Sequence, residues 1–152
     1  MEFVTLAADH IPKMHHLIGK LMLVSDGGLV SVPVAAMEEW LRNGLEDESL
    51  FGAIALDPEP IAYLVCELIE DPRGQSIHII HWYTEKSGIG TMLLKRIIEF
   101  GVCTCAIAVV GVISTKSGVE AARRAGATVV GLGMSLDLST VQNSNAVDEE
   151  EK

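Results

Sequence analysis

The stretch that decides the fold runs from Ser76 to Gly101 and reads SIHIIHWYTEKSGIGTMLLKRIIEFG. Its first part, Ser76 to Tyr83, is rich in β-branched and aromatic side chains and predicts a strand. A helix is predicted from Ile89 to Phe100, ended by Gly101, with an apolar face made of Ile89, Met92, Leu93, Ile97 and Phe100. A strand, a glycine loop and an amphipathic helix therefore follow one another directly.

The loop Glu85-Lys86-Ser87-Gly88-Ile89-Gly90 lies where this helix exposes its first main-chain N–H groups. These groups have no partner within the helix, and the helix dipole adds positive charge, so they can form an anion site. Glycines at 88 and 90 would let a phosphate approach the backbone, because a Cβ there would collide with it. A tight turn is the alternative interpretation, and the flanking elements favour phosphate binding.

Three strands are predicted in the centre of the chain, from Leu50 to Leu56, from Ile61 to Ile69 and from Ser76 to Tyr83. The turn sequences Asp57-Pro58-Glu59-Pro60 and Asp71-Pro72-Arg73-Gly74 join them. Because both connections are short, we expect an antiparallel meander.

Before this meander the sequence predicts a strand and two helices. Phe3 to Leu6 is the strand, and Asp9 is the expected N-cap of a helix whose apolar face is Ile11, Met14, Leu17, Ile18, Leu21 and Met22. Ser25 to Gly28 is a predicted loop. Pro33 is expected to open a second helix that ends near Gly44 and turns inward Met37, Trp40 and Leu41.

After the glycine-loop helix, Ala106 to Ile113 is almost continuously apolar, which is typical of a strand covered on both faces and often parallel. A short helix is predicted from Ser117 to Ala125, with a capping box of Ser117 and Glu120, closed by Gly126. Thr128 to Leu138 is the last predicted strand.

The element order is therefore βααβββαβαβ, which predicts an α/β (α+β) domain with helices on both faces of a mixed, mostly antiparallel central sheet. A chain of 152 residues, 49% of them apolar, can bury one sizeable core. We expect one domain over residues 1–138. The acidic tail over residues 139–152 is predicted to be disordered.

Charge and hydropathy narrow the expected partners. The net charge of −10 repels nucleic acid and anionic lipid, so neither is an expected partner.

Met1 to Ala8 does not resemble a secretory signal, and Val102 to Ile113 is too short to cross a bilayer. Cys66, Cys103 and Cys105 lie in apolar runs and suggest buried, reduced thiols, the last two on alternate faces of a strand rather than in a metal site. We expect a cytoplasmic protein.

The loop and the order of elements resemble the GNAT superfamily of acyl-CoA N-acyltransferases, whose pyrophosphate loop reads Arg or Gln, x, x, Gly, x, Gly or Ala. The resemblance covers about residues 2–138 and is strongest from Ile77 to Gly126. It implies acetyl-CoA as the acyl donor and no metal. It also implies that the strand Ile77 to Tyr83 parts from the strand Ala106 to Ile113 and opens a cleft for the pantetheine arm.

The same resemblance implies the donor-binding residues. Backbone groups near Ile80, His81 and Trp82 would hold the arm and polarise the acyl carbonyl. Main-chain N–H groups in the loop would bind the pyrophosphate, and two lysines could add charge or be ordinary surface cations. The implied set is Ile80, Trp82, Lys86, Ser87, Gly88, Ile89, Gly90, Thr91 and Lys116.

Two positions depart from the family pattern. Glu85 stands where the family usually has Arg or Gln, and its carboxylate would weaken pyrophosphate binding unless it points away. Ala122 stands where the family often has a Tyr that protonates the leaving thiolate.

Amine acetylation needs a group that takes a proton from an ammonium ion, and a His or a carboxylate can do this. The catalytic candidates are His81, Glu67 and His78. His78 and His81 differ by an odd number of positions, so they face opposite sides of the sheet unless a bulge intervenes. We favour His81 because it is nearer the loop, with a purely structural histidine as the alternative.

The first functional hypothesis is an N-acetyltransferase that moves an acetyl group from acetyl-CoA to a primary amine by direct attack in a ternary complex. The acidic surface suits a cationic acceptor, such as a polyamine, an aminoglycoside or a lysine side chain.

The second functional hypothesis is a catalytically silent GNAT-like subunit of a larger assembly, for example a phage virion. A Rossmann-type nucleotide site fits less well, because Gly88-Ile89-Gly90 lacks the third glycine. A homodimer and a larger assembly both stay open.

Overall fold

The structure is a computed structural model that describes residues 1–24, 32–113 and 115–128. The predicted loop at Ser25 to Gly28 and the acidic tail lie outside these residues, and so does the last predicted strand beyond Thr128.

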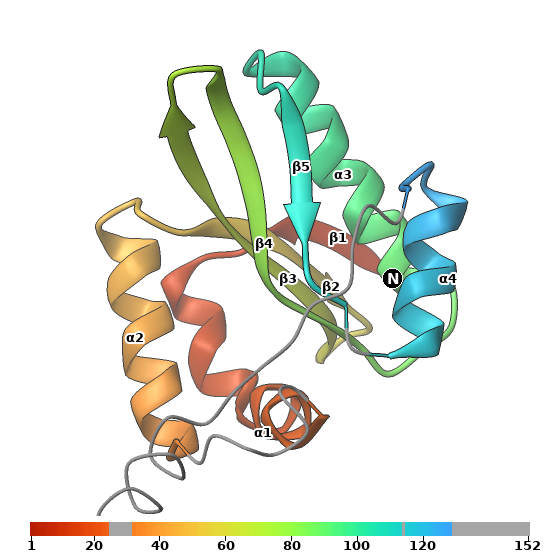
Figure 1. Ribbon diagram of the computed structural model, residues 1–152. Coiled ribbons are helices and arrows are strands. Elements are labelled where there is room, and N and C mark those ends of the chain that lie inside the picture. The colour runs from red at the N-terminus through yellow and green to blue at the C-terminus, as the bar shows by residue number, and fades with distance from the viewer. Residues whose placement is uncertain (25–31, 114, 129–152) are drawn as a thin grey trace, which may run out of the picture.

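The centre of the molecule is a five-stranded mixed sheet (Figure 1). The strands are β1 (Glu2–Thr5), β2 (Phe51–Leu56), β3 (Pro60–Asp71), β4 (Gly74–Thr84) and β5 (Ala108–Gly111). They lie in the order β1-β2-β3-β4-β5, with every pair antiparallel except β4 and β5, which are parallel. The predicted meander and the mixed, mostly antiparallel sheet are confirmed.

Helices cover both faces of this sheet. They are the 3-10 helix η1 (Ala8–Lys13), α1 (His15–Val24), α2 (Val34–Glu46), α3 (Ile89–Cys103) and α4 (Lys116–Arg124). Figure 1 shows α1 and α2 on one side of the strands and α3 and α4 on the other. Two apolar cores result, as a sheet buried on both faces requires.

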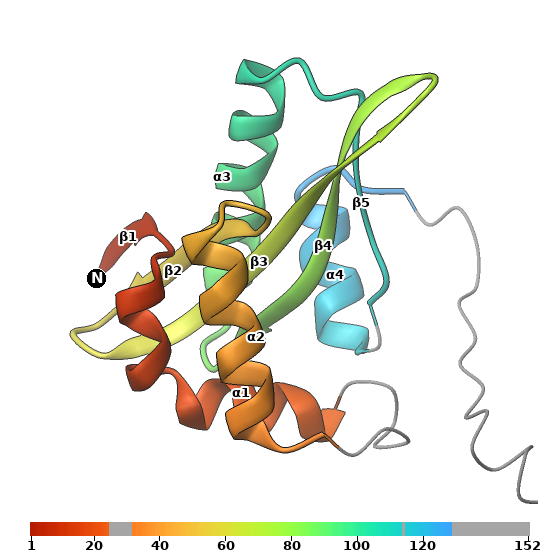
Figure 2. The same cartoon turned by 90° about the vertical axis from the view of Figure 1, so that its left-hand side faces the viewer.

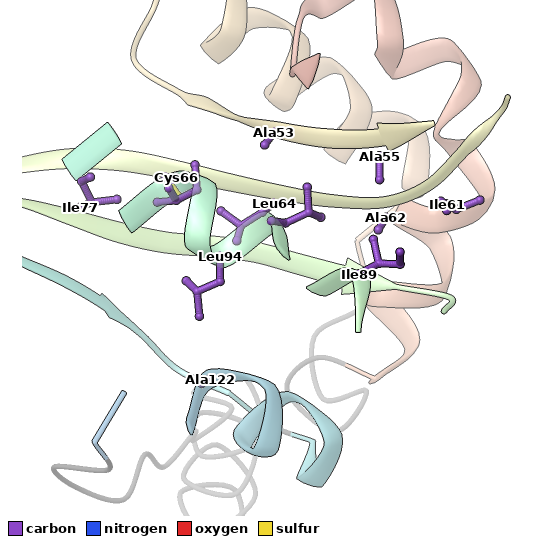
Figure 3. Close-up of a cluster of buried hydrophobic side chains, with 12 residues drawn as sticks. Ala53, Ala55, Ile61, Ala62, Leu64, Cys66, Ile77, Ile89, Leu94 and Ala122 are labelled. Carbon is purple, nitrogen blue, oxygen red and sulfur yellow. The ribbon is translucent and has the colours of Figure 1, made fainter. Parts of the chain in front are cut away.

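Strand β3 contributes to both cores because its side chains alternate between its faces. Leu64 and Cys66 pack in the core beneath α3, which Figure 3 shows together with Ala122 of α4. Tyr63 and Val65 pack in the core beneath η1, α1 and α2. This alternation assigns each neighbouring β4 residue to a face through the strand register.

Some helix predictions were wrong. The first helix does not start at Asp9 and run through Met14; Asp9 lies in η1, which contains Pro12, and α1 starts at His15. Gly101 was predicted to end the helix that starts at Ile89, but α3 continues to Cys103. The absence of a side chain at Gly101 lets α3 pack closely against Ile77 of β4. The large side chains predicted to face the core but found partly in solvent are Trp40 (49% exposed), Met92 (51%) and Phe100 (40%).

The predictions for the region after α3 also need correction. β5 is shorter than the predicted strand, and three of its four residues are exposed, so it is not covered on both faces; Val112 just beyond it is 86% exposed. Within the described residues β5 is also an edge strand of the sheet. The N-cap of α4 is Thr115, whose Oγ1 accepts a hydrogen bond from the N–H of Gly118, and Ser117 is already inside the helix.

The three cysteines are free thiols, but only Cys66 is buried. Burial raises the pKa of the Cys66 thiol to about 12, which keeps it protonated. Cys103 is the last residue of α3, and Cys105 follows in a turn with a φ of 59°. Both are exposed, so their predicted burial on alternate faces of a strand was wrong.

Two glycine substitutions should change stability in opposite directions. A Cβ on Gly52 would lie 2.0 Å from the carbonyl oxygen of Leu64 on the paired strand, so Gly52→Ala should lower the free energy of unfolding by about 1–3 kcal/mol or more. In α1, a Cβ on Gly19 meets only Val34 Cγ2 at 3.7 Å, so Gly19→Ala should raise it by about 0.5–1 kcal/mol. Urea denaturation measures both. Equal effects would contradict the packing described here.

Candidate functional site

The strands β4 and β5 pair only over part of their course. The parallel register runs from Ser76 with Ala108 to Ile79 with Gly111, and β4 then continues to Thr84 without a β5 partner. Beyond Ile79, that edge of β4 therefore carries main-chain N–H and C=O groups that no strand of the described residues pairs. The strands part as the GNAT resemblance implied.

A β-bulge in β4 lies at the same point. His81 is paired with Val65 of β3, but Cys66 is paired with Ile79, so Ile80 is an extra residue. The bulge shifts the alternation by one, so His78 and His81 lie on the same face of the sheet. Their cross-strand partners on β3, Glu67 and Val65, lie on that face as well. The default expectation that the two histidines face opposite sides was wrong, and the bulge is the reason.

The glycine loop leads from β4 into the N-terminus of α3. Gly88 is the N-cap and has a φ of +85°, a left-handed conformation that glycine adopts without strain, and no side chain caps the helix. Nothing lies within 4 Å of the position of a Gly88 Cβ, so the space above the loop is open. The first amides of α3 are therefore unoccupied by side chains of the described residues.

Gly90 has a different role from the one expected. A Cβ there would stand 3.2 Å from Trp82 Nε1 and 3.3 Å from Thr84 Cγ2, so this glycine lets the first turn of α3 pack against β4. Thr84 also shapes the loop, because its Oγ1 donates to the carbonyl of Lys86 and accepts from the Lys86 N–H. Trp82 Nε1 itself is buried and has no hydrogen-bond partner among the described residues.

A cavity of about 420 Å³ joins these features. Its walls come from the end of α1, the unpaired part of β4, the glycine loop, the segment after β5 and one side of α4. The predicted donor-binding residues that line it are Ile80, Trp82, Lys86, Ser87, Gly88 and Gly90. The other three, Ile89, Thr91 and Lys116, are not part of the lining. Ile89 is buried in the core beneath α3, the Oγ1 of Thr91 lies 3.4 Å from the carbonyl oxygen of Ala121, and Lys116 is exposed.

A second cavity, of about 640 Å³, lies between α3, β5 and α4. Its walls are mostly aliphatic, with Ile98, Val109 and Val119 among them, and the glycine loop is not one of its walls. Aliphatic walls offer few donors to a diphosphate, so we take the smaller cavity as the candidate site.

Both charged side chains of the loop are held in ion pairs. Glu85 Oε1 lies 2.5 Å from Lys20 Nζ of α1, and Lys86 Nζ donates to Asp57 Oδ2 at 3.0 Å. The hydrogen bond to Glu85 raises the pKa of Lys20, and the hydrogen bond from Lys86 lowers the pKa of Asp57. The Glu85 carboxylate that the sequence placed beside the anion site is thus directed to α1.

The sequence interpretation missed a cation at this cavity. Arg124 lines it together with Ser117 and Ala121, and these residues recur along α4 at positions i, i+4 and i+7. That spacing puts the three on one face of a helix, which could have been noticed from the sequence. Ala122 is buried in the core beneath α3, and its methyl side chain has no ionisable proton, so this helix position cannot supply the acid that the family pattern has there.

The predicted catalytic side chains lie on the opposite face of the sheet from α3. His81 Nδ1 is 3.1 Å from the hydroxyl oxygen of Tyr63, and the His81 ring lies against the rings of Tyr63 and Trp40. Burial lowers the pKa of His81 to about 4, so the imidazole is neutral at neutral pH. Burial raises the pKa of Tyr63, whose hydroxyl keeps its proton.

Glu67 and His78 are brought together, but away from the loop. They are partners across β3 and β4, towards the hairpin that projects beyond the helices in Figure 2. His78 Nε2 lies 3.1 Å from the Ser76 hydroxyl oxygen. None of Glu67, His78 and His81 is among the described residues that line the cavity.

The described residues also bear on metal binding and on membrane insertion. Groups of three or more His, Cys, Asp or Glu side chains that could hold a metal ion were not found in that part of the chain. Nor does any described helix combine the length and apolar character needed to span a membrane.

Comparison with known proteins shows the fold. No family model and no curated protein matches the chain. A predicted acetyltransferase with acetyl-CoA from Clostridium acetobutylicum matches with a TM-score of 0.70 and 19% identity, over 91% of this chain and 97% of that one. A GCN5-related N-acetyltransferase from Ralstonia eutropha JMP134 matches with a TM-score of 0.67 and 19% identity, over 89% and 97%.

A third match is an aminoglycoside acetyltransferase from an uncultured soil metagenomic sample, in complex with sisomicin. Its TM-score is 0.66 at 18% identity, over 90% of this chain and 96% of that one. Together these likenesses establish that the chain has the GNAT acetyltransferase fold, as the loop and the order of elements predicted.

The environment of His81 predicts how stability depends on pH. Its pKa is about 4 in the folded protein against an ordinary value of 6.5, so the unfolded chain binds more protons between these values. The contribution of His81 to the free energy of unfolding is therefore present above about pH 6.5 and is lost as the pH falls through about 4. His81→Gln should remove that part of the pH dependence in urea titrations. A His81 ring that titrates near 6.5 by NMR would contradict the burial described here.

Proposed function

We propose that this protein is an acyl-CoA N-acyltransferase that moves an acetyl group from acetyl-CoA to a primary amine. The observation that carries the proposal is the meeting of the uncapped N-terminus of α3 and the unpaired edge of β4 in one cavity. One feature offers donors to a diphosphate and the other offers donors to an extended amide-bearing arm. Acetyl-CoA contains both parts.

The diphosphate would bind to main-chain N–H groups of the loop and of the first turn of α3. Gly88 leaves the approach to these groups open, and helix-terminal amides favour anions through hydrogen bonds and through the helix dipole. Ser87, Ile89, Gly90 and Thr91 are the proposed donors, with Lys86 beside them. Arg124 on the opposite wall adds a charge that the sequence interpretation did not include.

The pantetheine arm would lie along the edge of β4 from Ile80 to Trp82. This edge continues beyond the last β5 pair, so its amides can bond to a ligand as they would to another strand. An N–H near the bulge would also stabilise the negative charge that develops on the thioester oxygen during attack. The neutral amine nitrogen forms its bond to the acetyl carbon, and the carbon–sulfur bond breaks to release the thiolate. The proton that the nitrogen loses as the amide forms passes through solvent to the thiolate, so the products are the amide and the free thiol.

A base must first take a proton from the ammonium form of the acceptor. His81 is the proposed base because it lies at the bulge and its imidazole is neutral at neutral pH. If Nδ1 donates to the Tyr63 oxygen, the lone pair of Nε2 is free to accept the proton. A pKa of about 4 makes this a weak base, so Glu67 and His78, on the same face of the sheet, remain the second choice.

The proposed acceptor is a cationic primary amine, such as a polyamine, an aminoglycoside or a lysine side chain. The net charge of −10 attracts cations from solution, and a protein of the same fold binds the aminoglycoside sisomicin. Transfer by direct attack needs the donor and the acceptor bound together.

A catalytically silent binding or structural subunit is the second candidate. The observation in its favour is the residue type at position 122: Ala122 packs in the core beneath α3, and an alanine has no proton to donate to a leaving thiolate. Turnover measured as thiol release, with acetyl-CoA and a panel of the three amine classes, separates the candidates. If acetyl-CoA binds but releases no thiol in the presence of any of these amines, the silent subunit is favoured.

Acetyl-CoA should raise the melting temperature of the wild-type protein. A ligand at 100 times its Kd adds about 2.7 kcal/mol to the free energy of unfolding. Gly88→Asp should abolish this rise, because the new carboxylate would stand in the open space above the loop. Gly126→Asp is the matched control: Gly126 also has positive φ and open surroundings, but it does not line this cavity. Thermal shift assays of the three proteins measure the effect. A wild-type protein without any rise, or a Gly88→Asp variant with the full rise, would contradict the site.

A further inference from the structure

The negative charge of the Glu85 carboxylate disfavours the binding of an anion nearby. Glu85 lines the candidate cavity and precedes Gly88, the N-cap of α3, by three positions. Its backbone is fixed, because its N–H donates to the carbonyl of Ile61 at 3.0 Å. An unpaired carboxylate on the wall of this cavity would repel a bound diphosphate.

Lys20 forms an ion pair with Glu85 and so neutralises its charge. Its ammonium group lies 2.5 Å from Glu85 Oε1, and the two residues are 65 positions apart in the chain. Lys20 belongs to α1, the helix whose Leu21 and Val24 also line the cavity. The pair therefore joins the glycine loop to the α1 wall and directs the carboxylate towards that wall.

The other charged residue of the loop is neutralised in the same way. Lys86 donates to Asp57 in the turn between β2 and β3. With both side chains paired, the loop presents little net side-chain charge, and the main-chain amides of α3 determine its attraction for anions.

We propose that Lys20 is a positioning residue of the acyl-donor site, which neutralises the Glu85 carboxylate and holds it away from the diphosphate. The inference rests on the proposed function and deepens it. Lys20 acts through Glu85 and does not itself touch the donor. Loss of Lys20 should therefore weaken donor binding only while residue 85 carries a negative charge.

The test is a double-mutant cycle on the affinity for acetyl-CoA, measured by isothermal titration calorimetry at low ionic strength. The variants are Lys20→Met, Glu85→Gln and the double variant, and each replacement keeps a side chain of similar length. Lys13→Met, in η1, is the matched control, because it removes an exposed lysine that has no ion pair with Glu85. Thermal unfolding without ligand checks that each variant is folded.

Lys20→Met should raise the Kd for acetyl-CoA about fivefold, the order of magnitude expected for a partly exposed charge interaction. Lys13→Met should leave the Kd unchanged within about twofold. In the Glu85→Gln background, Lys20→Met should have no effect, and the double variant should bind as tightly as wild type. The penalty of Lys20→Met should also shrink as salt is added.

The contrary outcomes are distinct. Equal weakening by Lys20→Met in both backgrounds would mean that Lys20 contacts the donor directly, and it would overturn the positioning role. Unchanged affinity in Lys20→Met, with tight binding by wild type, would overturn this inference and leave the proposed function intact. A wild-type protein that does not bind acetyl-CoA would overturn both.

Discussion

The parting of β4 from β5 after Ile79 and Gly111 is the constraint on which the site depends. A continuous parallel pair would satisfy the edge of β4 with hydrogen bonds and leave no room beside the glycine loop. Because the pairing stops, unpaired backbone groups of β4 and uncapped amides of α3 face one cavity. The bulge at Ile80 coincides with this point and turns His81 towards Tyr63. Backbone geometry therefore makes the site, and side chains adjust it.

Charge is the second constraint on the proposed site. Under the proposed function, a chain with a net charge of −10 would attract the cationic acceptor but repel a donor that carries phosphates. The structure reduces the repulsion locally, with Lys20 on Glu85, Arg124 on the α4 wall and the α3 dipole beneath the loop. The proposed function thus assigns donor binding to local geometry and the attraction of amines to the wider acidic surface.

The fold was predictable because its signals are local: alternation predicts strands, short turns predict antiparallel pairing, and the glycine loop marks the start of α3. The bulge was not, since no residue type in Ile79-Ile80-His81 specifies one. The pairing of Lys20 with Glu85 spans 65 positions and emerges only from the tertiary packing. The exposure of Met92 and Phe100 has the same origin, because the helical period defines a stripe but not how wide the covered face is.

The most direct measurement of the central claim is a ¹H–¹⁵N NMR titration of the protein with acetyl-CoA. The proposed donor site predicts that the largest amide shifts fall in two segments, Ser87 to Thr91 and Ile80 to Trp82, both of which contribute residues to the cavity that opens where the pairing of β4 and β5 ends. Saturating acetyl-CoA that leaves these amides unmoved, or that shifts residues around the second, aliphatic cavity instead, would contradict it.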